Sequence, residues 1–172
     1  TISSRLLLNL INEVLDMSKL ESGRIMLTDE VFNLDELLES LFIMVQSSFE
    51  AKKQQLHIRV IRVKHECLIG DVQRIQQALM NMLTNAIKYT PEGGQIRIEV
   101  EEKPSVYNGY SRFEIAVEDN GIGMKPEFLH KVFEPFERSE DISVRNIQGT
   151  GLGMAISRHI AQMMNGDILV ES

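Results

Sequence analysis

The sequence predicts an α+β protein, a two-layer sandwich of helices on a mixed, mostly antiparallel sheet, preceded by one helical arm. Apolar residues recur every three or four positions in several long segments, which is typical of amphipathic helices. Apolar and polar residues alternate in several shorter segments, which is typical of strands. These helices and strands are interleaved along 172 residues, a length that suits one domain with a short appendage.

The first segment predicts the helical arm. Its apolar residues lie on one helical stripe and are Leu6, Leu7, Leu10, Ile11, Val14 and Met17. Gly23 then supplies a C-terminal cap, so we divide the chain into an arm, residues 1–24, and a main domain, residues 25–172. Two interpretations of the stripe remain open: it packs on its own domain, or it forms a dimer seam with a partner helix.

In the main domain, the sequence pattern predicts alternating helices and strands. An extended piece covers 26–32, and Asn33 precedes a helix of about 18 residues because its side chain can cap the first turn. The other expected elements are strands at 56–61 and 67–69, a helix from Val72 to Tyr89, strands at 96–100 and 113–117, a helix from Gly151 to Met164 and a strand at 168–170. Asn108-Gly109 between the middle two strands predicts an antiparallel hairpin.

The composition excludes several classes of function. The chain has 18 Lys and Arg against 25 Asp and Glu, a net charge of −7, which argues against binding to a nucleic-acid backbone. The single Cys67 excludes a disulfide framework and a cysteine-rich zinc module. No apolar run reaches the ~18–20 residues that span a bilayer. We therefore expect a cytoplasmic chain without membrane contact of its own, whose full-length parent could be membrane-anchored.

One face of the predicted helix 72–89 is unusually polar. Gln77, Asn81, Asn85 and Lys88 fall on that face at 100° per residue, opposite an apolar face of core type. Asn is a poor residue for a helix interior, so two of them four apart indicate a bound group. Amide oxygens suit Mg²⁺, and an ammonium group suits a phosphate. A solvated polar face is the alternative.

Five of the eleven glycines lie in two short boxes, residues 119–123 and 149–153. In the first, Gly121 and Gly123 follow Asp119 directly after a strand, so backbone can approach a ligand while the carboxylate accepts from an amine. The second runs straight into a helix, whose first N–H groups can bind an anion. It lacks the Gly-Lys-Ser/Thr of a Walker loop. Two unrelated tight turns are the alternative interpretation.

Four motifs together resemble the catalytic and ATP-binding domain of sensor histidine kinases. Residues 70–91 resemble the family's N box, Asp119-x-Gly121-x-Gly123-Met124 the first glycine box, Phe133–Arg138 the F box and Gly149–Gly153 the second glycine box. Their order and spacing also match the family. Residues 10–23 resemble the second helix of the family's dimerisation and phosphoacceptor hairpin, which favours the dimer-seam interpretation.

The resemblance implies the Bergerat ATP-binding fold and assigns roles to individual residues. Asp119 would recognise the adenine amino group, with Met124 near the base, and Asn85 would hold Mg²⁺. The other residues expected near ATP are Asn81, Lys88 and Tyr89 on the helix, Arg138 and Gln148 in a lid over 137–148, and the backbone of Gly149, Thr150, Gly151, Leu152 and Gly153. Asn81 and Lys88 are the residues expected to assist catalysis.

The implied reaction transfers the γ-phosphoryl group of Mg·ATP to a histidine on a helix of the hairpin. The implied partners are the chain's own phosphoacceptor hairpin, in a homodimer, and a response-regulator receiver domain. None of His57, His65, His130 and His159 fits the family's acceptor pattern, so we expect the acceptor outside this sequence. The chain also ends where the family adds a further glycine-rich turn and strand.

Two other functions remain open. An ATP-hydrolysing switch, as in gyrase-type and chaperone relatives, would place a Glu base four residues before the Mg²⁺-binding Asn. That position holds Asn81, which is a poor proton acceptor, so the sequence argues against hydrolysis as the main output. A nucleotide-binding scaffold without catalysis is the third hypothesis.

Overall fold

The structure is a computed structural model that describes residues 2–23, 26–137 and 149–172. It divides into two compact units, each described below by itself. The sheet unit comprises residues 29–72 and 83–123, and the helical unit comprises residues 1–28, 73–82 and 124–172. The division into an arm, 1–24, and a main domain, 25–172, stays a prediction.

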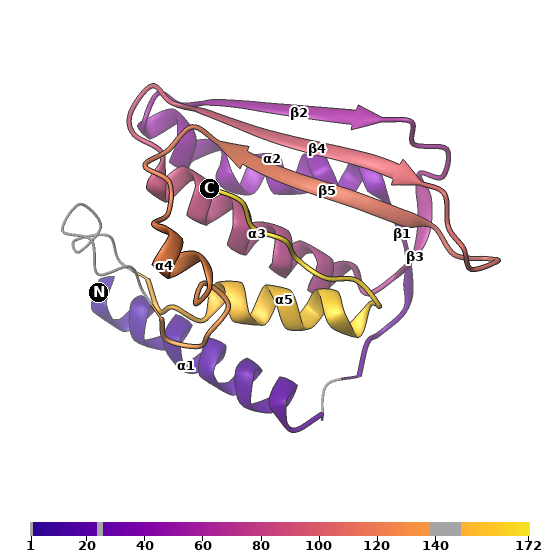
Figure 1. Cartoon of the computed structure of the whole chain (residues 1–172), viewed down its shortest axis with the longest axis horizontal. Helices are drawn as coiled ribbons and strands as arrows, with labels where there is room; N and C mark the ends of the chain where they lie inside the picture. The colour runs from indigo at the N-terminus through magenta and orange to yellow at the C-terminus, as the bar shows by residue number, and fades with distance from the viewer. Residues whose placement is uncertain (1, 24–25, 138–148) are drawn as a thin grey trace. The chain divides into compact units, whose positions relative to one another are not determined.

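The sheet unit is built on three strands in the order β2-β4-β5, namely Gln55–Ile61, Gln95–Lys103 and Arg112–Asp119 (Figure 1). β2 pairs with β4 in parallel, and β4 pairs with β5 as the predicted antiparallel hairpin. β1 (Glu30–Asn33) and β3 (Cys67–Gly70) form a separate antiparallel pair. The pairings are thus mixed and mostly antiparallel, as predicted, although they form two sheets.

Helix α2 (Leu34–Ala51) contacts β1 and β2 through an apolar stripe. Its start is capped as expected: Asn33 Oδ1 accepts the backbone N–H groups of Asp35 at 2.8 Å and Glu36 at 3.2 Å. The core of the sheet unit consists of residues that are at most 9% exposed: Leu34, Leu37, Leu38, Leu41, Val45 and Phe49 from α2, Leu83, Ala86 and Ile87 from the following helix, and Ile96, Ile98 and Val100 from β4.

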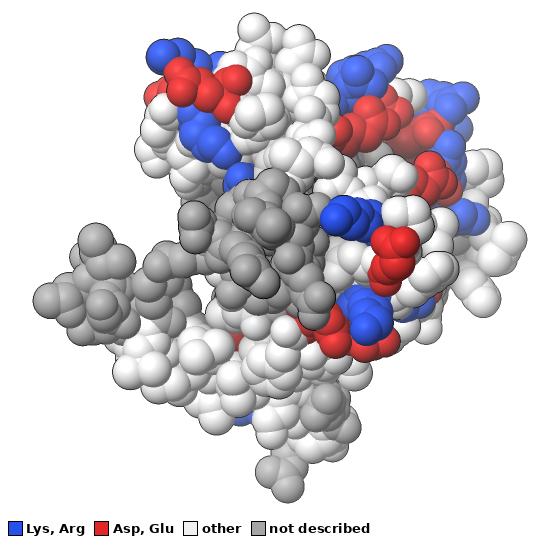
Figure 2. Space-filling view, turned by 60° about the vertical axis from the view of Figure 1, so that its left-hand side comes forward, with Lys and Arg blue, Asp and Glu red and all other residues white. Residues whose placement is uncertain are grey.

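The outer face of the sheet carries cross-strand ion pairs. Arg97 Nη1 lies 3.1 Å from Glu118 Oε2, and Arg59 Nη1 lies 3.2 Å from Glu99 Oε2. On the face shown in Figure 2, basic and acidic side chains likewise lie side by side rather than in separate areas. Such exposed pairs stabilise a sheet only slightly, by ~0.2–1 kcal/mol each.

The helical unit contains α1 (Ile2–Glu21), α4 (Pro126–Leu129), α5 (Gly153–Met163) and residues 73–82 of α3 (Val72–Tyr89). Ala78, Leu152, Ile156 and Ile160 form its buried cluster, against which Met17, Met163 and Met164 pack. Polar bonds also join α1 to α3: Asp16 Oδ2 accepts from Gln77 Nε2 at 2.9 Å and lies 3.3 Å from Arg74 Nη1.

Helix α1 therefore packs on its own chain, but only through part of its surface. Its contacts involve Glu13, Asp16 and Met17, whereas Leu7, Leu8, Ile11, Val14 and Leu15 are 41–58% exposed. Its end is as predicted, because α1 stops at Glu21 and Gly23 adopts the left-handed φ of +64°. The packing on its own domain is present in the structure, and the exposed stripe leaves room for a partner helix.

Two sequence predictions are corrected at the C-terminal end. Helix α5 begins at Gly153 instead of Gly151, because Gly151 has a φ of +76°, which is incompatible with a right-handed helix. The predicted strand at 168–170 does not form: Leu169 is 88% exposed, and the segment pairs with no strand of the described chain. Three alternating residues make a strand only where a neighbouring strand offers backbone partners. The described helices include none long and apolar enough to cross a membrane.

Candidate functional site

The predicted site residues fall into two groups, one in each unit. Asn85, Lys88, Tyr89, Asp119, Gly121 and Gly123 belong to the sheet unit, whereas Asn81, Met124 and residues 149–153 belong to the helical unit. Arg138 and Gln148, together with nearly all of the predicted lid, lie outside the residues that the structure describes.

The two asparagines of α3 have different surroundings. Asn81 Nδ2 donates to the carbonyl oxygen of Gly153 at 3.0 Å and to Ser157 Oγ at 3.1 Å, so this amide holds the first turn of α5. Asn85 is half-buried, and its side chain takes part in no hydrogen bond or ion pair among residues 2–23, 26–137 and 149–172. A polar side chain that the described residues leave unbonded is suited to a bound group.

The last turn of α3 carries Lys88 and Tyr89 side by side. The Lys88 Nζ lies 5.1 Å from the centroid of the Tyr89 ring, a cation–π distance. The carbonyl oxygen of Tyr89 accepts the N–H of Ile122 at 3.2 Å, so the helix end is bonded to the first glycine box. The structure therefore brings this predicted pair next to the loop after β5.

The first glycine box is a close turn with specific steric demands. Asp119 Oδ1 accepts the N–H of Gly121 at 2.9 Å, which occupies one oxygen of an exposed carboxylate and leaves the other for a ligand. A Cβ on Gly121 would lie 2.6 Å from the Tyr89 carbonyl oxygen and 2.6 Å from Asp119 Oδ1. Gly123 has a φ of +70°. Both glycines are thus required by the backbone itself.

Asn120 of the same box has a structural task. Its Oδ1 accepts the N–H of Gln95 at 2.7 Å, and its own N–H donates to the Gln95 carbonyl oxygen at 3.2 Å. These bonds fix the end of β5 to the start of β4, which holds Asp119 at the edge of the sheet.

The second glycine box is equally constrained within the helical unit. Thr150 Oγ1 donates to Glu13 Oε2 on α1 and accepts the N–H of Leu152 at 3.2 Å. A Cβ on Gly151 would lie 2.8 Å from the carbonyl carbon of Phe136 and 2.9 Å from the Glu137 carbonyl oxygen. The side chain of Leu152 is fully buried in the core, so only its backbone is suited to contact a ligand.

Helix α5 starts without a side-chain cap. Leu152 is its N-cap residue and offers no side-chain acceptor to the first turn. The helix dipole places a partial positive charge at this end, which favours phosphate oxygens. Met124, another predicted site residue of the helical unit, is half-buried, and its N–H donates to Ser172 Oγ at 2.6 Å.

The residues present fit Mg²⁺ only as a companion of a phosphate ligand. The described residues contain no group of three His, Cys, Asp or Glu side chains that could hold a metal ion. No described residue donates to the amide oxygen of Asn85, and Mg²⁺ takes its other ligands from water and substrate phosphates in many sites. The donor set therefore predicts binding of the Mg·nucleotide complex rather than of the free ion.

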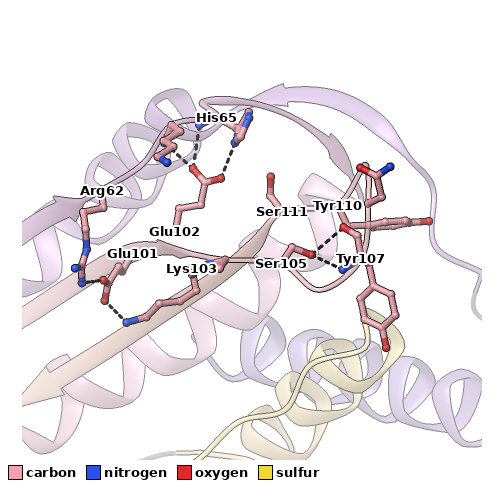
Figure 3. A pocket seen from close by; sticks show the side chains of 13 residues that line it. Arg62, His65, Glu101, Glu102, Lys103, Ser105, Tyr107, Tyr110 and Ser111 are labelled. Atoms are coloured by element: carbon pink, nitrogen blue, oxygen red, sulfur yellow. Dashed lines mark hydrogen bonds and ion pairs between the residues drawn. The ribbon is translucent and has the colours of Figure 1, made fainter.

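An open pocket of about 700 Å³ lies at the opposite end of the hairpin from Asp119 (Figure 3). The eight residues of β5 are joined by seven steps of about 3.4 Å, so the two ends lie roughly 24 Å apart. Glu102 accepts from His65 Nδ1 at 2.5 Å and from the N–H of Lys64 at 2.6 Å, and these bonds lower the pKa of Glu102 to about 2. The Glu102 carboxylate thereby ties the β2–β3 connection to β4. The lining of the pocket contains no predicted site residue, so we assign this pocket a structural role.

Two further residues, Lys52 and Gln54, bond to the helix end that carries Lys88 and Tyr89, and no sequence pattern predicted them. Both donate side-chain hydrogen bonds to carbonyl oxygens at the end of α3. In the sequence they appear only as part of a polar run after a helix, and their partners lie 33–38 residues further along the chain.

Comparisons with known proteins place this geometry in context. A model of the family described as histidine kinase-, DNA gyrase B-, and HSP90-like ATPase matches residues 70–172, which contain both glycine boxes and the whole of α3. The sensor histidine kinase GacS of Pseudomonas protegens is 36% identical over 169 residues, or 96% of this chain and 18% of GacS. Hybrid signal transduction histidine kinase B of Dictyostelium discoideum is 36% identical over 172 residues, 99% of this chain and 9% of that protein.

Two solved structures are also similar. Full-length ShkA in complex with AMPPNP has a TM-score of 0.72 and 27% identity, with 92% of this chain and 31% of that chain covered. Histidine kinase ThkA in complex with the response regulator protein TrrA has a TM-score of 0.70 and 26% identity, with 95% and 42% covered. This chain thus spans less than a fifth of the two curated relatives and less than half of these two structures.

Proposed function

Since the chain belongs to the family of histidine kinase-, DNA gyrase B- and HSP90-like ATPases, we propose that it is the ATP-binding catalytic part of a sensor histidine kinase. It transfers the γ-phosphoryl group of ATP to a histidine on a phosphoacceptor helix. The curated relatives named above support this choice within the family, because each is a histidine kinase by name.

The observation that carries the choice of a kinase over a hydrolysing ATPase is the state of Asn81. An amide cannot take a proton from water, and Asn81 Nδ2 is committed to Gly153 and Ser157. No base is thus offered at the position where the family's hydrolysing members place a Glu. Phosphoryl transfer then depends on positioning and on an acceptor that supplies its own nucleophile.

The proposed roles of the described residues rest on the contacts given above. Asp119 accepts a hydrogen bond from the adenine amino group through the oxygen that its turn leaves unused. Asn85 offers its amide oxygen to Mg²⁺, which would neutralise phosphate charge when bound. Lys88 faces the phosphates, and the uncapped start of α5 with the 149–153 backbone binds their oxygens. We further propose that Tyr89, Gly121, Gly123 and Met124 line the nucleotide. Arg138 and Gln148, which lie outside the described residues, are assigned to ATP by the family resemblance alone.

The proposed partners follow from the same assignment. ThkA, one of the structural relatives, is seen with a response regulator protein, so we propose a receiver domain as the partner that takes the phosphoryl group onward. We also propose that the exposed stripe of α1 pairs with a phosphoacceptor hairpin in a homodimer. A kinase works where ATP is supplied, so we also propose that this part of the protein lies in the cytoplasm.

The substitution Asn85→Ala tests the proposed binding mode. Removal of the amide oxygen should reduce the gain in ATP affinity that Mg²⁺ provides by about tenfold, equivalent to about 1.4 kcal/mol. ATP affinity without Mg²⁺ should stay within about twofold of the wild-type value, because the adenine contacts remain. Calorimetric titrations with ATP, in Mg²⁺ and in a chelator, measure both quantities.

Asn108→Ala is the matched control, since it makes the same chemical change in an exposed loop of the hairpin. It should reproduce the wild-type values in both buffers. An unchanged gain from Mg²⁺ in Asn85→Ala would refute the assignment of Asn85. Tight binding of Mg²⁺ to the protein without nucleotide would contradict the proposal as well, because one amide oxygen is too few ligands for that.

A further inference from the structure

The side chain of Lys52 is directed at the C-terminal end of α3. Its Nζ donates to the carbonyl oxygens of Ile87 at 2.7 Å, Lys88 at 3.2 Å and Thr90 at 2.6 Å. An ammonium group has three N–H donors, so all of them are used. The last carbonyl groups of a helix lack intrahelical partners and carry partial negative charge, which makes a cation favourable at this place.

Gln54 reinforces the same contact from a buried position. It is 5% exposed, and its Nε2 donates to the carbonyl oxygens of Ile87 at 3.0 Å and Thr90 at 2.7 Å. The carbonyl oxygens of Ile87 and Thr90 therefore each accept hydrogen bonds from both Lys52 and Gln54. The backbone adds a further bond, because Gly93 N–H donates to the Lys52 carbonyl oxygen at 2.9 Å.

Within the described chain, the ammonium group of Lys52 interacts with the carbonyl groups at this helix end and with no carboxylate. None of the ion pairs among the described residues involves Lys52. Its neighbour Lys53 differs: its Nζ forms an ion pair with Glu92 Oε1 at 2.6 Å, and both side chains are more than 60% exposed. The two adjacent lysines thus carry the same ammonium group, but Lys52 binds backbone carbonyls and Lys53 binds an exposed carboxylate.

The helix end held by Lys52 and Gln54 also holds the first glycine box. The Tyr89 carbonyl oxygen, between the Lys88 and Thr90 carbonyls, accepts from Ile122 N–H at 3.2 Å, and Gly121 passes so close that a Cβ would lie 2.6 Å from it. A shift of the last turn would therefore move Lys88, Tyr89 and the 119–123 loop together.

We propose that Lys52 and Gln54 are positioning residues for nucleotide binding. They fix the last turn of α3, which places Lys88 and Tyr89 and, through the Tyr89 carbonyl, the loop after Asp119. This inference rests on the proposed function, because it assigns the loop and the helix end to the ATP site. Neither side chain needs to touch the nucleotide.

Lys52→Met and Lys53→Met form a matched pair that tests the proposal. Both remove an ammonium group and keep an unbranched stem. We expect Lys52→Met to weaken binding of ATP and ADP by about tenfold, as a small misplacement of binding groups does, and Lys53→Met to stay within about twofold of wild type. Lys52→Arg keeps the charge and N–H donors and should recover most of the loss. Calorimetry measures the affinities.

Amide hydrogen exchange supplies a second measurement that needs no nucleotide. In Lys52→Met, exchange of the Thr90 and Ile122 amides should accelerate about tenfold, while exchange of the β4 amide of Ile98 should match Lys53→Met. Uniform acceleration across β4 would overturn the proposal, because it would show general destabilisation. If Lys52→Met does not fold, Gln54→Met decides, with the same expected direction.

The outcomes separate this inference from the proposed function. Equal ATP affinity and equal exchange in Lys52→Met and Lys53→Met would overturn the positioning role even if ATP binds well. A wild-type chain that binds no ATP would instead overturn the proposed function and the assignment of the positioned groups to an ATP site. If exchange at Thr90 and Ile122 were still faster in Lys52→Met, Lys52 would hold the end of α3 and the 119–123 loop together, but its role in nucleotide binding would be refuted.

Discussion

Asp119→Ala is expected to lower the affinity for ATP by about tenfold to a hundredfold, because a charged acceptor for the adenine amino group is lost. A hydrogen bond to a charged group contributes about 1.5–3 kcal/mol, which corresponds to that range. The substitution also removes the Asp119 Oδ1 contact to Gly121 N–H. Asp119→Asn is therefore needed beside it, since an amide oxygen can still accept from Gly121 while the negative charge is absent.

Calorimetry with ATP and GTP measures this prediction. The wild-type chain should prefer ATP, because a carboxylate accepts from the amino group of adenine and repels the carbonyl oxygen that guanine has there. Glu118→Ala is the control: this neighbouring carboxylate is exposed and pairs with Arg97, so its loss should leave ATP binding unchanged. Wild-type affinity in both Asp119 variants, or equal binding of GTP by the wild type, would refute the placement of the base.

Gly151→Ala should lower the stability of the fold strongly. A residue other than glycine at a φ of +76° costs about 1–2 kcal/mol, and the added Cβ would lie 2.8 Å from backbone of Phe136. Relief of such an overlap costs about 1–3 kcal/mol more, because a backbone atom cannot rotate away. We expect a loss of about 2–5 kcal/mol in the free energy of unfolding and weaker phosphate binding by the 149–153 backbone.

Gly109→Ala isolates the steric part of this effect. Gly109 has a φ of +80°, but a Cβ there would meet no atom within 4 Å. Denaturant unfolding should therefore show a loss of about 1–2 kcal/mol for Gly109→Ala and clearly more for Gly151→Ala. Equal losses in the two variants would show that the contact between Gly151 and the Phe136–Glu137 backbone is not tight.

Local patterns predicted the elements that depend on local interactions. Helix α3 covers Val72–Tyr89 as its periodicity and the following Thr-Pro indicated, and Asn33 caps α2 through bonds to residues two and three further on. The β4–β5 hairpin follows from alternation and the Asn-Gly loop. In each case the partners are close in sequence, so a single window of residues contains the cause.

The features that could not be predicted from the sequence depend on contacts between residues far apart in the chain. Asn81 and Asn85 look equivalent on one helix face, but Asn81 bonds to residues 72 and 76 positions away, and Asn85 does not. The same limit explains the missed Lys52 and Gln54 and the strand wrongly predicted at 168–170. The glycine boxes could be located from sequence, whereas the reason for Gly121 lies in the carbonyl of Tyr89, which only the fold brings near.

The most direct test of the proposed kinase function is phosphoryl transfer to a supplied acceptor. The chain is incubated with γ-labelled ATP, Mg²⁺ and a separate helical hairpin that carries an acceptor histidine, and the same hairpin with glutamine in its place is the control. We expect acid-labile, base-stable label on the histidine hairpin, background label on this chain and only slow release of phosphate without acceptor. Label on His57, His65, His130 or His159, or rapid hydrolysis of ATP with no hairpin present, would contradict the account.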